Sequence, residues 1–112
     1  MSASAAGQVL FVPINISTAT TTHLIAAVSG KTIVVDKAVF CFSGTTPTAK
    51  FQDTTGTPVV LTGVFDTAGV YALLGERLNP LFATSKGQGL DIVTTGTPSM
   101  RGFLAYHLED AQ

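Results

Sequence analysis

One long run of β-branched and aromatic residues, Lys31–Ser43, constrains the fold of this chain more than any other segment. Its large apolar members are Ile33, Val34, Val35, Val39, Phe40 and Phe42. Such residues favour strands. A second apolar run, Thr22–Val28, is separated from it only by Ser29-Gly30, and glycine can supply the positive φ of a tight turn. The sequence therefore predicts a hairpin over residues 22–43, with its second strand at the centre of the fold.

The apolar alternation changes parity inside this long strand. The residues concerned are Ile33 and Val35 before the change, and Ala38, Phe40 and Phe42 after it. Side chains alternate between the faces of a strand, so one extra residue turns everything that follows to the other face. We therefore expect a bulge or a bend at Asp36-Lys37 that keeps both halves of the strand facing the core.

Turn-forming residues divide the rest of the chain into short apolar segments. They occur at 44–47 (GTTP), 54–58 (TTGTP), 75–80 (GERLNP), 84–89 (TSKGQG) and 94–98 (TTGTP). This spacing is typical of a two-sheet all-β domain. It predicts an antiparallel β-sandwich, jelly-roll-like, of about eight short strands. The repeated TTGTP indicates either a duplicated β-unit or the same turn chemistry used twice.

The 112 residues fit one domain. Residues 1–8 are small and polar, and we expect them to form a flexible arm that becomes ordered only on a partner, because they cannot offset their own ordering entropy. Residues 9–109 form the predicted sandwich domain, and residues 110–112 a polar tail. In the first strand, Val9–Ile16, Pro13 cannot donate to a ladder, so this strand should lie at an edge or be bulged there.

Composition bears on the possible partners. Only 12% of residues are charged and the net charge is −1, against a usual charged fraction of about 25%. No basic stripe is present, so we expect no nucleic-acid binding. The apolar runs are much shorter than the ~20 residues of a membrane helix, and no secretory signal pattern opens the chain. A weakly charged, threonine-rich surface suits a protein that stays in contact with other protein.

No group of residues has the spacing of a catalytic or metal site. His23 and His107 lack a nucleophile or metal partner at motif spacing, and we expect both to be structural or solvent-facing. Cys41, between two phenylalanines, is expected to be a small buried or half-buried hydrophobe. Three acidic residues, Asp53, Asp66 and Asp91, do not have the spacing of a calcium-binding motif. Carboxylates beside turns usually accept hydrogen bonds from local backbone N–H groups. We therefore predict no enzymatic activity, no cofactor and no metal.

Three apolar residues are candidates for contacts with a partner. In the closing strand Phe103 has the parity opposite to Leu104 and Tyr106, so it stands among polar neighbours. It is either half-buried under a loop or an anchor of a subunit contact. Val9 and Phe11, next to the N-terminal arm, are the other two candidates.

The run from Ile16 to Gly44, ISTATTTHLIAAVSGKTIVVDKAVFCFSG, resembles a recurring type of small phage-encoded protein. These proteins have a threonine-rich lead, an LVAAV-like strand, a Gly-Lys turn and a long β-branched strand. The segment 75–79, GERLN, is similar to a GEALN-type segment later in the same group, and the resemblance covers residues 14–106.

The resemblance implies a β-sandwich virion protein of the head decoration, or capsid cement, type. Such proteins are commonly trimers that bind the major capsid protein on the outer surface of the head, and the resemblance brings no catalytic residues. The alternative is a receptor- or glycan-binding module of a phage fibre or tail, with Tyr71 and Tyr106 stacking on sugars.

Overall fold

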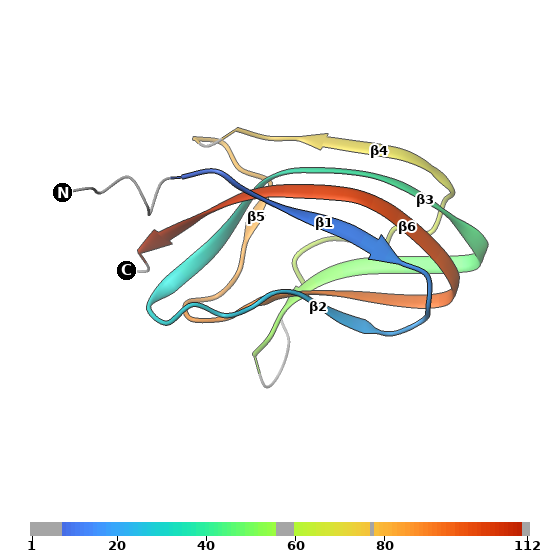
Figure 1. Cartoon of the computed structure of the whole chain (residues 1–112), viewed down its shortest axis with the longest axis horizontal. Coiled ribbons are helices and arrows are strands. Elements are labelled where there is room, and N and C mark those ends of the chain that lie inside the picture. Colours follow the sequence, from blue (N-terminus) through green and yellow to red (C-terminus); the bar gives the residue numbers. More distant parts are fainter. Residues whose placement is uncertain (1–7, 56–59, 77, 111–112) are drawn as a thin grey trace.

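The computed structural model describes residues 8–55, 60–76 and 78–110. Within these residues every regular element is a strand, and the six strands form one antiparallel sheet (Figure 1). The prediction of an all-β, antiparallel fold is therefore confirmed. No helix in this part of the chain could cross a membrane.

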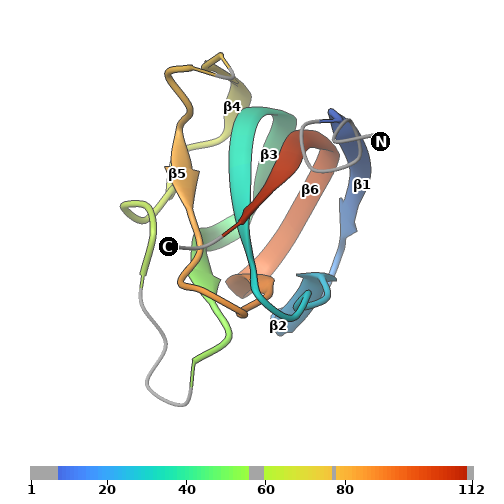
Figure 2. The same ribbon diagram turned by 90° about the vertical axis from the view of Figure 1, so that its left-hand side faces the viewer.

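The strands differ greatly in length. They are β1 (Leu10–Ile16), β2 (Thr21–Ile25), β3 (Lys31–Asp53), β4 (Gly69–Leu74), β5 (Phe82–Ala83) and β6 (Leu90–Asp110). Across the sheet the order is β1-β6-β3-β4, while β2 also pairs with β6 and β5 with β3. Figure 2 shows β4, β3, β6 and β1 next to one another. The expectation of about eight short strands is wrong, because β3 and β6 span 23 and 21 residues.

β3 and β6 pair along nearly their whole lengths and bend together where turns were expected. Their register shifts between Thr45 and Thr48, and Gly44 and Gly96 have φ angles of 131° and 74°. A Cβ on Gly44 would lie 1.9 Å from the carbonyl oxygen of Thr97, so the bend requires glycine there. Beyond the bend, the two halves of the long strands turn back over one another (Figure 1).

The core lies between these two halves. One half supplies buried residues of β1 and of the first part of β3, such as Ile14 and Phe40, and the other supplies Phe51 of β3 and Ile92 of β6. The predicted bulge is confirmed, since the register between β3 and β6 shifts between Val35 and Lys37. As a result the inward residues on both sides of it are buried: Ile33, Val35, Ala38, Phe40 and Phe42.

Two predictions about the N-terminal half have opposite outcomes. The hairpin over residues 22–43 is wrong: a turn is present, with the Lys31 N–H donating to the Val28 carbonyl at 3.0 Å, but β2 pairs with β6 and not with β3. Of the two alternatives for the Pro13 strand, the edge position is confirmed, because among the described strands β1 pairs only with β6. The expected arm lies outside the described residues, apart from Gln8, and so does most of the expected tail.

Candidate interaction surface

The side of the sheet that points away from the core is largely apolar over β1, β6, β3 and β4, and we call it the outer face. Antiparallel pairing aligns three rows of residues across these strands: Phe11–Ala105–Lys37–Leu74, Pro13–Phe103–Val39–Ala72 and Asn15–Arg101–Cys41–Val70. Paired residues share a face. All of these side chains except Asn15, Lys37 and Arg101 are apolar.

Several large side chains of the outer face are open to solvent. Phe11 is 69% exposed, Val70 74% and Leu74 67%, and Phe103 and Val9 are less exposed. Contiguous exposed apolar residues mark interaction sites on proteins of this size. The expectation that Cys41 is buried or half-buried is wrong: Cys41 is exposed, because its neighbours Phe40 and Phe42 take the inward positions.

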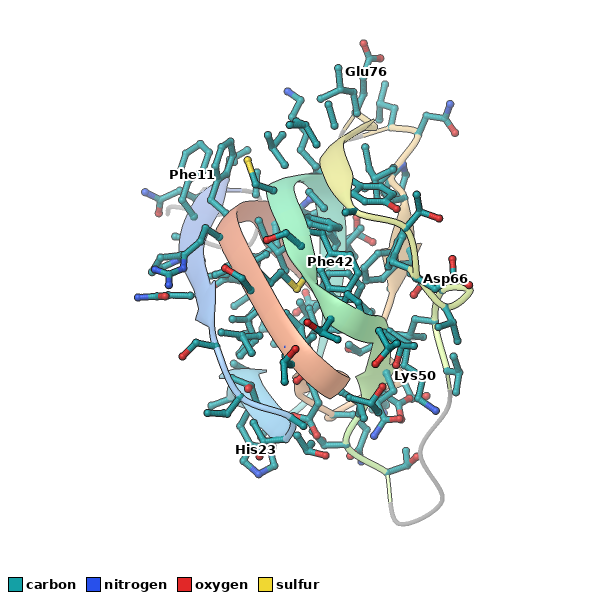
Figure 3. The ribbon with its side chains drawn as sticks, turned by 90° about the vertical axis from the view of Figure 1, so that its right-hand side faces the viewer. Phe11, His23, Phe42, Lys50, Asp66 and Glu76 are labelled. Carbon is teal, nitrogen blue, oxygen red and sulfur yellow. The ribbon has the colours of Figure 1, made fainter. Side chains whose placement is uncertain are left out.

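The structure brings the three predicted contact residues together. The rings of Phe11 and Phe103 meet edge to face with their centroids 5.9 Å apart, and Phe11 stands on the outside of the sheet while Phe42 lies in the interior (Figure 3). Phe103 is thus half-covered by a side chain of the adjacent strand, and 37% of it stays exposed. Val9 follows on the same side, just before β1.

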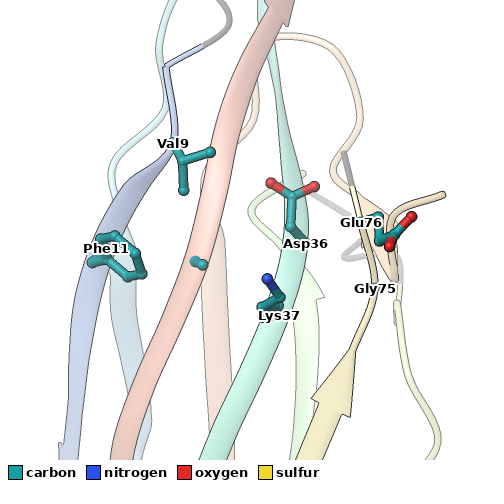
Figure 4. A pocket seen from close by; sticks show the side chains of 7 residues that line it. Val9, Phe11, Asp36, Lys37, Gly75 and Glu76 are labelled. Carbon is teal, nitrogen blue, oxygen red and sulfur yellow. The ribbon is translucent and has the colours of Figure 1, made fainter. Parts of the chain in front are cut away.

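A groove of about 270 Å³ opens at one end of the outer face. Val9, Phe11 and Ala105 supply its apolar wall, and Asp36 and Lys37 of the bulge lie opposite (Figure 4). The segment after β4 closes the far side with Gly75 and Glu76. The groove therefore combines an apolar wall with two carboxylates and one ammonium group.

The groove borders a buried histidine held between two carboxylates. The Nδ1 atom of His107 lies 2.9 Å from Oδ2 of Asp36, and its Nε2 atom lies 2.7 Å from Oε2 of Glu109. Both ring nitrogens face acceptors, and only imidazolium can donate from both. Burial lowers the pKa of His107, but the two hydrogen bonds and the two negative charges outweigh it, so the pKa is raised above 6.5.

This arrangement predicts how stability depends on pH. A raised pKa means that the folded state binds the His107 proton more tightly than the unfolded state. The stabilisation is present in full below pH 6.5 and is lost as pH rises through the raised pKa. As pH rises above 6.5 and through the raised pKa of His107, the melting temperature should therefore fall. His107→Gln should flatten this dependence, whereas His23→Gln, at an exposed position, should keep it; an unchanged slope in the first variant would contradict the assignment.

The two histidines do not come together. His23 of β2 is exposed, and its Nδ1 atom lies 2.8 Å from Oδ1 of Asp91, near the start of β6. His107 lies near the other end of β6 and is fully buried. Their expected roles, solvent-facing or structural, agree with these positions. No group of three or more His, Cys, Asp or Glu side chains in the described part of the chain could hold a metal ion.

The remaining predicted residues lie in structural positions. The Asp53 carboxylate accepts hydrogen bonds from Thr55 and Ser85, as expected for a carboxylate beside a turn. The ring of Tyr71 stacks on Phe40, with centroids 5.1 Å apart. Tyr106 packs against the core. Both tyrosines are therefore half-buried against the core.

Sequence reasoning missed the Asp36–His107–Glu109 cluster. His107 and Glu109 are two positions apart in one strand, which puts them on the same face. The second feature that could have indicated the cluster is Asp36, an acidic residue that stands between two apolar runs. The sequence does not reveal the register between β3 and β6. This register places Val34 opposite His107 and so brings the bulge that contains Asp36 next to the histidine.

Comparison with known proteins adds no relative to this description: no family model, no curated protein and no solved structure matches the chain.

Proposed function

We propose that this chain is a structural binding protein that attaches to other protein through its outer face. The observation that carries the proposal is the cluster of exposed apolar side chains there, above all Phe11, Phe103, Val70 and Leu74. Burying such side chains against a partner is favourable by roughly 25 cal/mol per Å² of apolar surface removed from water. Exposed aromatics that pair with each other are typical anchors of such contacts.

The more specific proposal is head decoration. The resemblance over residues 14–106 supports a protein that sits on the outside of a phage capsid, binds neighbouring copies of the major capsid protein and associates with itself, as a trimer. The bent antiparallel sheet with its core between two halves is compatible with a sandwich of the jelly-roll kind. A protein that binds the assembled shell, and not its separated subunits, stabilises the shell by mass action.

Comparing particles with and without this protein tests the role directly. Heads of the phage that encodes the chain should lose resistance to heat and to low salt when the protein is removed, and should regain it when the purified protein is added back. An antibody against the chain should label the outside of intact heads. Equal resistance of stripped and complete particles, or labelling confined to the tail, would contradict the cement role.

The outer face makes a prediction for single substitutions. Phe11→Ala and Phe103→Ala should each weaken attachment to heads, and self-association, by about 1–3 kcal/mol, or roughly 5–150-fold in Kd. Co-sedimentation with heads and sedimentation velocity of the free protein measure the two effects.

The matched control is Val64→Ala, which removes an exposed apolar side chain from the connection between β3 and β4. It should leave both measurements unchanged. If Phe11→Ala instead lowers the melting temperature and leaves attachment as it was, the ring serves the fold and the outer face is not the contact surface.

A further inference from the structure

The Asp36 carboxylate is buried but only half satisfied. Its Oδ2 atom receives a hydrogen bond from His107, while Oδ1 has no hydrogen-bond partner in the described part of the chain. The side chain is only 7% exposed. A buried acceptor without a donor costs about 1–3 kcal/mol, and more when it is charged. Ordered water or a donor from a bound molecule can satisfy such an acceptor, and Asp36 is one of the residues that line the groove.

The groove has the composition that suits a long cationic side chain. Val9, Phe11 and Ala105 offer an apolar wall for an aliphatic stem, and the carboxylates of Asp36 and Glu76 lie where the charged end would rest. The exposed ring of Phe11 can also contact a cation through its π face. The volume of about 270 Å³ is near the lower end of the usual ~300–1,000 Å³ of small-molecule pockets and leaves room for one long side chain.

Other charges around Asp36 also bear on this site. His107 and Glu109 lie behind it and form an ion pair of their own. Lys37, on the same bulge, points toward Asp36 in Figure 4, but no ion pair within 4.0 Å joins them in the described part of the chain. Lys37 is exposed, so its side chain can move. It is therefore a competitor for the place above Asp36, not its permanent partner.

We infer that this groove receives one arginine or lysine side chain from the protein that docks on the outer face. The aliphatic stem lies along Val9 and Phe11, and the cationic end displaces Lys37 and donates to Oδ1 of Asp36. The inference rests on the proposed function, because it names the chemistry of the partner at one point of that surface. It adds that the partner presents a basic residue at the edge of an apolar patch.

Titration of the isotope-labelled chain with a single-residue probe tests the groove without any partner. Nα-acetylarginine methylamide should shift the backbone amide signals of Phe11, Lys37 and Ala105 in a saturable way. The citrulline analogue has nearly the same shape and no charge, and it should bind at least threefold more weakly. Lys37→Gln removes the competitor and should tighten arginine binding at least twofold. Lys50→Gln makes the same change in the other half of β3 and should have no effect.

Loss of the carboxylate is the complementary test. Asp36→Asn and Glu76→Gln should each weaken arginine binding at least threefold, whereas Asp66→Asn, in the loop before β4, should not. If Asp36→Asn fails to fold, because it also loses its charged partner His107, then Glu76→Gln and Lys37→Gln decide the question.

Equal binding of arginine and citrulline, or no response to Lys37→Gln, would overturn the inference. Head attachment by Phe11→Ala and Phe103→Ala is measured separately, so failure of the groove and failure of the docking face can be told apart.

Discussion

Phe40→Ala should lower the free energy of unfolding by roughly 3–5 kcal/mol, the usual cost of deleting a buried phenylalanine ring. Phe40 is 1% exposed, and its ring contacts Phe51, Phe65 and Tyr71 at centroid distances of 6.4, 5.6 and 5.1 Å. These rings come from β3, from β4 and from the loop between them. The cavity would therefore open where both halves of the sheet meet, and no single neighbour could fill it.

Urea unfolding and thermal melting measure this effect. A loss of that size corresponds to a decrease in melting temperature on the order of 10–20 °C for a domain of about this length. Phe11→Ala is the control, because it deletes the same ring from an exposed position and should change the melting temperature by only a few degrees. A Phe40→Ala variant that melts like the unmodified protein would show that this cluster is not the core.

Gly102→Ala should cost roughly 3 kcal/mol or more, at the upper end of the range for overpacking. A Cβ at Gly102 would lie 2.0 Å from the carbonyl oxygen of Val39 and 2.6 Å from the Cα of Phe40. Both atoms belong to the backbone of β3, which pairs with β6 along this stretch. Relief of the clash would require the two central strands to move apart.

The control for this prediction is Gly63→Ala. A Cβ at Gly63 would meet nothing within 4 Å. Gly63→Ala therefore measures the effect on stability of replacing glycine by alanine where no clash arises. Gly63→Ala should unfold at nearly the same urea concentration as the unmodified protein. Gly102→Ala should unfold at a much lower concentration or accumulate as insoluble chain. Equal midpoints for the two variants would mean that β3 and β6 are not in contact at this point.

The features that sequence reasoning predicted correctly depend on local chemistry. The bulge at Asp36-Lys37 could be found because the parity of buried residues on each side is visible in the sequence itself. The edge position of β1 followed from Pro13, which lacks an N–H group. The alternation of residues in the closing strand also predicted that Phe103 points outward. Phe11 was a separate candidate, because the pairing of β1 with β6 that brings the two rings together is not visible in the sequence.

The features that were missed depend on pairings between distant segments. A turn at Ser29-Gly30 was predicted and is present, but a turn does not determine which strands pair beyond it, and β2 pairs with β6. Gly44 of GTTP and Gly96 of the second TTGTP do take positive φ angles. They bend two paired strands without reversing the chain. The same turn-forming residues occur in a chain-reversing turn and in such a bend, so the sequence does not distinguish the two. The groove and the His107 cluster arise only from the register of β6 against β1 and β3.

The placement of β3 and β6 has a consequence for the order in which the protein is made. β3 leaves the ribosome early, but its main partner, β6, is the last of the described strands to be synthesised. At about 5–20 residues per second, the segment 54–110 takes on the order of several seconds to appear. During that time the longest of the described strands lacks its partner along most of its length. Folding must therefore wait for the end of this segment, and a nascent chain that stalls before Leu90 exposes an unpaired strand that can associate with other chains.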